Sequence, residues 1–352
     1  MNAVTETFAA GMPVEIGQIE RELKKLWDQG GEMMTRASLM NLAVYSEQPD
    51  SLASNTQIVA EIADDHACRA IVIAGNPEQR EDRVEAWITA HCHVSGAGSR
   101  HICSEQISFS LGGSFARLLP NIVFSHLDSD LPFYFWWQGE FHDPMDPQLW
   151  TRVDRLIFDS HDWENFDEQI QLVDGARAES NPRMILCDLN WTRLVHFRLG
   201  LAQFFDQPAC LARLAEIDRV EIEFEPEYRS TAVLLVGWLS AQLGWMPGDA
   251  TGNEPWCVTD PCGRAVSVRL EEKAGDPVGR CSVFCGDTEF RVVNPKGADL
   301  IQISHHVAGK ERMHKLMPAG GSGPVALMRE ELMRGGTHRI YLRAVEAVRP
   351  WL

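Results

Sequence analysis

The chain has 352 residues, a formal net charge of −18 and a composition of 45% hydrophobic and 23% charged residues, as is ordinary for a soluble globular protein. The acidic balance argues against binding nucleic-acid phosphates as a main task, and the length suffices for two domains with separate cores. Eleven tryptophans favour a partner-binding surface as well as a core, because Trp combines a large apolar area with a hydrogen-bond donor.

The first 14 residues contain neither a basic segment nor an apolar core, so we expect no secretory signal there. The most apolar stretch, residues 232–243, is shorter than the roughly 20 residues that a membrane span requires. Nine cysteines without an export signal predict reduced thiols. We therefore expect a cytoplasmic protein that does not bind a membrane.

The first half of the chain alternates helical periodicity with short apolar runs. A strand over 38–45, a helix over 51–63 and a strand over 68–74 form a β–α–β unit, which implies a parallel strand pair with a right-handed crossover. The other elements expected before residue 165 are a helix at 16–29, a strand hairpin at 85–94 and 101–110, a helix at 115–126, and strands at 131–137 and 156–158.

The second half begins with longer helices and ends in short strands. A helix over 229–243 is apolar on nearly all sides, which predicts that Leu235 and Trp238 are buried. We expect an α/β module, a mixed sheet flanked by helices, over 1–165, followed by an α+β module over 166–352, with an alternative boundary near 248. Its further elements are a helix at 191–205, strands at 220–224, 265–271, 280–285, 289–293 and 300–306, a helix at 324–334, and a strand at 339–345.

Charge is distributed unevenly along the chain. Residues 128–179 contain 13 acidic and 3 basic side chains, whereas residues 310–352 contain 8 basic and 4 acidic ones. A solvated acidic surface explains the first run, and steering of a complementary partner is the alternative. Strand alternation would place Arg339, Tyr341 and Arg343 on one face, and with Arg334 they form a predicted partner-binding surface. Internal pairing of these arginines with the acidic run is the competing explanation.

Two groups of histidines and cysteines could carry chemistry. His91, His93, His101 and Cys103 could ligate zinc across a hairpin, but strand alternation sends neighbouring residues to opposite faces and no C-x-x-C motif is present. We therefore predict no metal site and interpret these residues as ordinary strand residues.

The second group consists of thiols near the start of the β-rich region. Cys257 and Cys262 flank a turn and are candidate redox thiols, whereas buried free thiols are the simpler explanation. Cys281 and Cys285 share one face of an expected strand, and the spacings do not match a zinc ribbon.

Two further features resemble ligand sites. Residues 319–323 are glycine-rich and precede a helix, as in a phosphate cradle, but capping by Ser322 or Gly323 explains them without a ligand. No nucleotide-binding loop, G-x-G-x-x-G fingerprint, G-x-S-x-G elbow or H-E-x-x-H motif occurs, so we predict neither cofactor nor catalytic residues. A carboxylate pair or a magnesium site could be built from Asp128, Asp130, Asp159 and Asp162, for which solvated loops are the simpler explanation.

Several segments, taken in order, resemble the glucose-6-phosphate dehydrogenase assembly protein family (OpcA). Their order and spacing carry the resemblance, which is strongest between residues 35 and 245. The segments are HACRAIV at 66–72, ICSEQI at 102–107, DLPFYFWW at 130–137, RLIFDS at 155–160, DLNWTRL at 188–194, and LLVGWL at 234–239 with LGW at 243–245.

The resemblance implies a protein without catalytic residues that binds glucose-6-phosphate dehydrogenase and promotes its assembly or active state. It would thereby support NADPH production through the oxidative pentose phosphate pathway. The alternatives are a sugar-phosphate enzyme of lactonase or isomerase type, and a sensor that binds a phosphosugar without converting it.

Overall fold

The computed structural model describes residues 11–30, 34–94, 101–142, 146–248 and 257–351. The chain divides into two compact units. The first unit comprises Met1–Phe158, Gln169–Cys187 and Met328–Gly335, and the second comprises Asp159–Glu168, Asp188–Leu327 and Gly336–Leu352. The boundaries predicted near residues 165 and 248 stay predictions. In the described part of the chain, no helix is long and apolar enough to cross a membrane.

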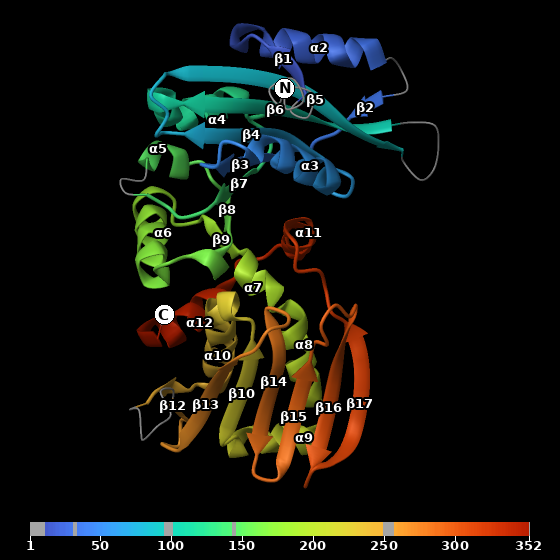
Figure 1. Ribbon diagram of the computed structural model, residues 1–352, viewed down its shortest axis with the longest axis vertical. Helices are drawn as coiled ribbons and strands as arrows, with labels where there is room; N and C mark the ends of the chain where they lie inside the picture. Colours follow the sequence, from blue (N-terminus) through green and yellow to red (C-terminus); the bar gives the residue numbers. More distant parts are fainter. Residues whose placement is uncertain (1–10, 31–33, 95–100, 143–145, 249–256, 352) are drawn as a thin grey trace. The chain divides into compact units, whose positions relative to one another are not determined.

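A nine-stranded sheet forms the centre of the first unit (Figure 1). Its order is β1-β5-β6-β4-β3-β7-β8-β9, and β2 pairs with β6. The strands are β1 (Met12–Val14), β2 (Met34–Arg36), β3 (Met40–Ser46), β4 (Cys68–Asn76), β5 (Arg83–Val94), β6 (His101–Gly112), β7 (Phe133–Gln138), β8 (Arg155–Phe158) and β9 (Ile185–Asp188). The helices along this part of the chain are α2 (Ile19–Gly30), α3 (Ser51–Ala63), α4 (Leu119–His126), α5 (Pro147–Trp150) and α6 (Phe166–Ser180).

Strand β4 pairs in parallel with β6 and β3, and β7 pairs in parallel with β3 and β8. With β9 at the end, this is the doubly wound order 3-2-1-4-5-6 that is typical of dinucleotide-binding folds. Because both faces of such strands are covered, they consist of nearly continuous apolar residues, and all seven residues of β3 are buried. The predicted β–α–β unit is confirmed in β3, α3 and β4.

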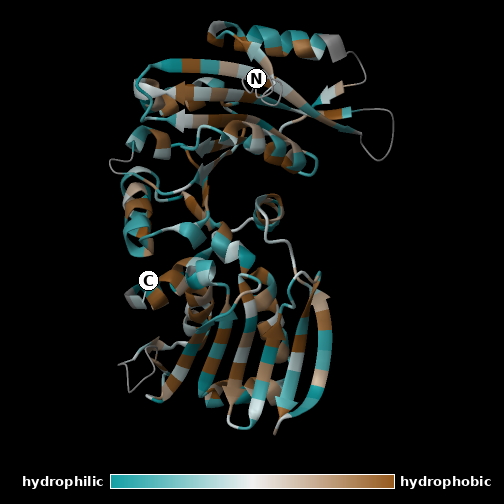
Figure 2. Ribbon diagram, in the orientation of Figure 1, coloured by the Kyte–Doolittle hydropathy of each residue, from teal (hydrophilic) through white to brown (hydrophobic). Residues whose placement is uncertain are grey.

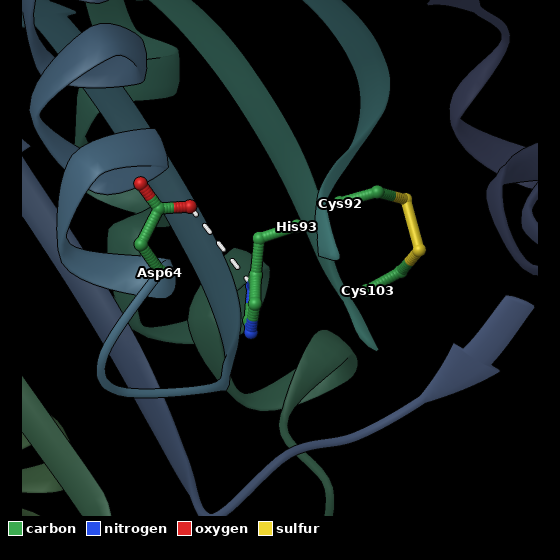
Figure 3. The surroundings of a disulfide bond; sticks show 4 residues. All are labelled: Asp64, Cys92, His93 and Cys103. Atoms are coloured by element: carbon green, nitrogen blue, oxygen red, sulfur yellow. Dashed lines mark ion pairs between the residues drawn. A yellow bond between two sulfur atoms is a disulfide. The ribbon is translucent and has the colours of Figure 1, made fainter. Parts of the chain in front are cut away.

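A disulfide links Cys92 of β5 to Cys103 of β6, which pair directly in the sheet (Figure 3). The sequence-based expectation of reduced thiols throughout is therefore wrong for this pair. That expectation was based on the odd number of cysteines and on the lack of a secretory signal in the first 14 residues. Neither feature predicts which cysteines the hairpin register places opposite each other.

The second unit contains an eight-stranded sheet in the order β11-β12-β13-β10-β14-β15-β16-β17. Its strands are β10 (Arg219–Phe224), β11 (Met246–Pro247), β12 (Cys257–Thr259), β13 (Ala265–Glu272), β14 (Val278–Cys285), β15 (Thr288–Val293), β16 (Leu300–Val307) and β17 (Lys310–Pro318). The helices along this part of the chain are α7 (Leu189–Arg193), α8 (Val195–Phe204), α9 (Pro208–Leu211), α10 (Arg229–Leu243), α11 (Pro324–Arg334) and α12 (Arg339–Val348).

Helices α8 and α10 pack against this second sheet, α8 on β15 and β16 and α10 on β10. Residues of β10 alternate between buried and half-buried, as a strand with one covered face should. Figure 2 shows the same alternation as bands of opposite hydropathy along these strands. The predicted class, an α/β sheet followed by a sheet-rich region with helices, is confirmed.

Two elements near the C-terminus differ from expectation. Residues 339–348 form helix α12, not a strand, because the buried residues Tyr341, Ala344, Val345 and Val348 follow a helical spacing. The alternation of Ile340 and Leu342 suggested a strand instead. Strand β17 was not predicted, because it is an edge strand with mostly exposed side chains and little apolar periodicity.

Helix α10 has the predicted bounds, but its burial is less uniform than expected. Leu235 is fully buried. Trp238, in contrast, is only partly buried, so its assignment to the core was wrong. Helix α12 packs along α10 in the same unit.

Candidate functional site

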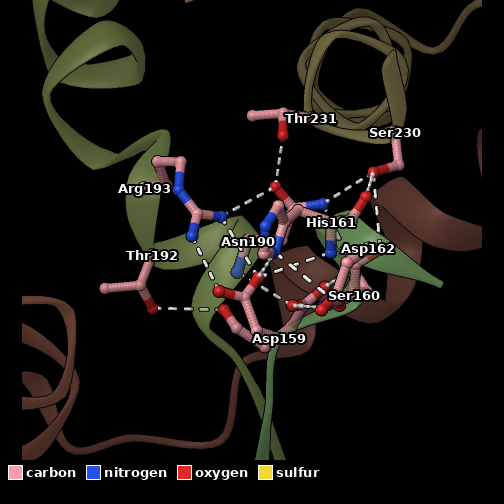
Figure 4. Close-up of polar contacts among 10 residues, drawn as sticks. Asp159, Ser160, His161, Asp162, Asn190, Thr192, Arg193, Ser230 and Thr231 are labelled. Carbon is pink, nitrogen blue, oxygen red and sulfur yellow. Dashed lines mark hydrogen bonds and ion pairs between the residues drawn. The ribbon is translucent and has the colours of Figure 1, made fainter. Parts of the chain in front are cut away.

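A cluster of polar side chains occupies the N-terminal end of helix α10 in the second unit (Figure 4). Asp159, Ser160 and His161 directly follow strand β8, and Asp188 is the last residue of strand β9. Because a doubly wound sheet binds its ligands beyond the carboxyl ends of its strands, residues at these positions are the first candidates for function.

Asp188 is fully buried and caps helix α7. Its carboxylate accepts hydrogen bonds from the Ser160 amide at 3.1 Å, the Ser160 hydroxyl at 2.7 Å and the Asn190 amide at 2.9 Å. Burial raises the pKa of Asp188 to about 7, and the nearby charge of Asp159 acts in the same direction.

Asp159 forms the charged centre of the cluster. Its two carboxylate oxygens accept hydrogen bonds from Arg193 at 3.2 and 2.7 Å, and His161 Nδ1 lies 3.0 Å from Oδ1. Burial opposes ionisation, but the hydrogen bonds from His161 and Arg193 outweigh it and hold the pKa of Asp159 at about 2. The His161 ring stacks on Tyr228 with its centroid 4.9 Å away, and the Arg193 guanidinium lies 5.3 Å from the same ring.

Asn190 connects the segments that carry Asp159 and Asp188 to helix α10. Its amide nitrogen donates to the hydroxyls of Ser160 and Ser230, each at 3.1 Å, and its amide oxygen accepts from Thr231 and Arg193. Three segments distant in sequence are thus held together by a buried and largely satisfied network.

The arrangement does not match nucleophilic catalysis. The Ser160 hydroxyl donates to Asp188, and His161 is oriented towards Asp159, so the serine has no histidine as its general base. Asp159 is held ionised by an arginine, which removes it as a proton donor near neutral pH. The geometry is that of a rigid connection between segments.

We expect the raised pKa of Asp188 to make stability depend on pH. Between about pH 4 and pH 7 the folded state keeps a proton that the unfolded chain has released, so stability falls as pH rises, by up to about 1.4 kcal/mol per pH unit. Asp188→Asn keeps the shape and removes this slope. Melting temperatures of both proteins from pH 4.5 to 8 test this, because the contribution of His161 cancels in the comparison. Parallel curves would show that Asp188 is ionised in the folded protein at neutral pH.

The predicted partner-binding residues lie on two helices. Arg334 ends α11 and pairs with Glu330 at 2.7 Å. Arg339 and Arg343 are exposed on α12, where the Arg343 guanidinium also donates to the Ala241 carbonyl. The prediction that Arg339, Tyr341 and Arg343 share one outward face is wrong, because Tyr341 is 1% exposed and lies against Trp191. A role of the arginines in partner binding stays a prediction.

Cys257 is buried in β12, Cys262 is exposed in the turn that follows, and neither forms a disulfide. Their redox role stays a prediction. Cys281 and Cys285 are buried in β14, and burial raises the pKa of each thiol to about 12, so they are unreactive at neutral pH.

The residues considered for zinc have other partners. Cys103 is bonded to Cys92 and therefore offers no thiolate. His91 shares a hydrogen bond of 2.8 Å with Gln106, and His93 lies 3.9 Å from Asp64 (Figure 3).

The four aspartates considered for a carboxylate pair or a magnesium site belong to different units, and the glycine-rich segment lines a cavity. Asp128 accepts a hydrogen bond from the amide of Asp130 in a turn before β7, in the first unit. Asp159 and Asp162 belong to the second unit. Of the glycine-rich segment 319–323, the first four residues line a cavity of about 240 Å³, together with Arg193.

The connection between β3 and α3 lies where a dinucleotide fold binds pyrophosphate. Here it has the sequence Glu47-Gln48-Pro49-Asp50, with no glycine and two carboxylates at the start of a helix. Glu47 accepts a hydrogen bond from Tyr45, and a reciprocal pair of 2.9 Å bonds joins Asn55 to Gln138 at the end of β7.

A groove of about 980 Å³ adjoins this connection. Its lining includes carboxylates from Glu15, Asp50 and Glu85, whereas its arginine, Arg83, is already paired with Glu85 at 2.6 Å. Such a lining disfavours phosphate.

Sequence reasoning singled out Asp159 and Asp162 but missed Asp188, Asn190 and Arg193. The available signal was an Asp-x-Asn directly after a short apolar run, which is typical of a helix N-cap at the end of a strand. The pairing of Arg193 with Asp159 had no local signal.

Two sequence profiles match the chain. One, described as "Glucose-6-phosphate dehydrogenase subunit N-terminal domain", matches residues 59–174, and the corresponding C-terminal domain profile matches residues 185–345. A protein of Nostoc punctiforme named OxPP cycle protein OpcA is 30% identical over 200 residues, which cover 55% of this chain and 42% of that protein. A protein of the same name from Synechococcus elongatus is 29% identical over 242 residues, covering 64% of this chain and 51% of that protein. The matched part thus spans about half or less of each relative.

Among solved structures, an aldose–aldose oxidoreductase from Caulobacter crescentus, complexed with glycerol, superposes with a TM-score of 0.50. The likeness covers 88% of this chain and 95% of that one at 9% sequence identity, so it concerns the fold alone. The two profiles, in contrast, are consecutive domains of one family and together cover well over half of the sequence. The chain belongs to the glucose-6-phosphate dehydrogenase assembly protein family, OpcA.

Proposed function

We propose that this protein is a non-catalytic cytoplasmic partner of glucose-6-phosphate dehydrogenase, which it binds to promote assembly or the active state. It would thereby support the oxidative pentose phosphate pathway. The observation that carries the proposal is the presence of both family domains in order.

The β3–α3 connection supports a role without catalysis. In dinucleotide-dependent enzymes this connection holds pyrophosphate on backbone amides at a helix N-terminus, and it needs glycines for the close approach. Glu47 and Asp50 place negative charge at that position, and Asn55 and Gln138 hydrogen-bond each other across it. These residues disfavour a nicotinamide dinucleotide.

Activation would work by preferential binding to one state of the enzyme. Shifting a 1:99 mixture of inactive and active forms to 99:1 requires about 5.5 kcal/mol of differential affinity. A few desolvated anchor residues at an interface can supply this amount.

We expect the purified protein to show no turnover of phosphosugars or lactones and to raise the activity of its cognate dehydrogenase in a saturable manner. Enzyme assays with and without the protein, together with the oligomer distribution by light scattering, test this. Bovine serum albumin at equal concentration is the control for non-specific protection. An unchanged rate and oligomer distribution would contradict the proposal, and turnover of a phosphosugar would favour the enzyme alternative.

The same assay tests the predicted binding surface. Arg339 is the cleaner probe, because it is exposed, whereas Arg343 also holds the Ala241 carbonyl. Arg339→Glu should raise the concentration of this protein that gives half-maximal activation at least tenfold. The melting temperature should stay that of the wild type. Arg312→Glu on the exposed strand β17 is the matched control. If both variants activate like the wild type, the binding surface lies elsewhere.

A further inference from the structure

The second unit contains a cavity that the network around Asp188 does not fill. It has a volume of about 240 Å³ and lies entirely within this unit. Its lining comes from helices α7, α8 and α10, the start of β14 with the two residues before it, the turn between β15 and β16, and the glycine-rich segment before α11. Its size suits a single small molecule.

The glycines are explained by close packing. Gly320 has a φ of +76°, and a Cβ there would lie 2.5 Å from the ring of His196 on helix α8. A side chain at Gly321 would overlap Ala326. The segment can therefore pass close to helix α8 only because position 320 has no side chain, and it can turn into helix α11 because position 321 has none.

The cavity lining has unsatisfied hydrogen-bonding capacity. Arg193 Nε, Asp276 Oδ2 and Asn294 Oδ1 are buried and have no hydrogen-bond partner among the residues that the structure describes. Burial also raises the pKa of Asp276. Unpaired buried polar atoms are rare in folded proteins, because each loses its hydrogen bonds to water without replacement, and a bound molecule would supply the missing partner. A small rotation about the terminal torsion, which is broad for Asp and Asn, would turn Asp276 and Asn294 to the cavity surface.

The charges around the cavity select against ions. Asp276 and Asp299 oppose an anion, and the charge of Arg193 is already balanced by Asp159. Among the described residues, Asp276 and Asp299 belong to no group of three or more possible metal ligands, so a metal ion would lack a coordination shell. A phosphate cradle at residues 319–323, which the sequence suggested as an alternative, therefore does not fit its surroundings.

A neutral ligand that carries several hydroxyl groups satisfies all of these constraints. Hydroxyls can donate to Asp276 and to the amide oxygen of Asn294 and can accept from the amide group of Asn294, because each hydroxyl is both donor and acceptor. Phe197 and Pro277 in the lining provide an apolar surface for the C–H groups of a sugar ring. We propose that this cavity is a binding site for a small neutral polyol of the size of a monosaccharide.

Saturation-transfer NMR on the full chain, with D-glucose as the probe and inorganic phosphate as the anionic comparison, tests this proposal. We expect saturable transfer to D-glucose and no competition by phosphate. Asn294→Leu removes one acceptor and Ala298→Leu fills the cavity without removing a polar group, and each should weaken binding at least tenfold. Asn121→Leu on the exposed surface of α4 is the matched control and should bind like the wild type.

Circular dichroism and melting curves establish that each variant is folded. Asn294→Leu removes a polar group, whereas Ala298→Leu only fills space, so if one of them fails to fold the other still tests the site. Transfer that never saturates would mean that the sugar makes only weak, non-specific contacts with the protein surface. Absence of transfer would mean that the cavity holds only ordered water, and competition by phosphate would mean that it is an anion site. Each of these outcomes, or normal binding by both cavity variants, would overturn the proposal. Because no dehydrogenase is present, the result is independent of the activation assay.

Discussion

Replacing Gly237 with alanine is expected to lower the free energy of unfolding by about 3 kcal/mol. Gly237 lies in the buried middle of α10, and a Cβ there would overlap the carbonyl oxygen of Ala344 on α12 and approach Val348 within 3.1 Å. A backbone oxygen cannot move aside without displacing the helix that carries it. Chemical denaturation of the full chain measures the effect.

The matched control is Gly175→Ala in helix α6, where a new Cβ meets nothing within 4 Å. Alanine restricts the unfolded chain and favours the helix, so this variant should be more stable by about 0.5–1 kcal/mol. The two substitutions are chemically identical and differ only in their surroundings. Equal changes in both variants would contradict the close packing of α10 on α12.

The second large effect is expected at Arg193, whose side chain is 7% exposed. Arg193→Met leaves the carboxylate of Asp159 without its bidentate partner, which should cost about 3–5 kcal/mol, the usual range for breaking a buried pair. The Asp159 side chain is 23% exposed and His161 remains close to it, and both features should keep the loss near the lower end. Denaturant unfolding at pH 7 measures the cost.

Adding Asp159→Asn to Arg193→Met should restore part of the lost stability, because no uncompensated charge is then buried. Arg21→Met is the surface control, since the Arg21 side chain is 63% exposed and its pair with Glu22 should contribute less than about 1 kcal/mol. If Arg193→Met costs no more than Arg21→Met, the cluster around Asp159 does not stabilise the fold.

The sequence by itself determined most of the elements, because their signals are local. Helices α3, α10 and α11 have the predicted bounds, and each shows either apolar periodicity or a continuous apolar run between turn residues. The β–α–β unit followed from the order of these elements and the handedness of crossovers. The family segments also lie on or directly beside one or two elements, such as ICSEQI in β6 and LLVGWL in α10, so their order and spacing could be recognised without the tertiary structure.

Only the tertiary structure decided which residues meet. Asp159, Asp188 and Arg193 come from the ends of two strands and from a helix, and no local pattern encodes that these positions coincide. The disulfide depends on hairpin register, and helix α12 depends on burial of Tyr341 against Trp191. The surroundings change the chemistry as well, since burial raises the pKa of Asp188 to about 7, whereas hydrogen bonds from His161 and Arg193 hold the pKa of Asp159 at about 2. The burial of Asp188 and the approach of Arg193 to Asp159 come from long-range packing, and no local pattern in the sequence encodes them.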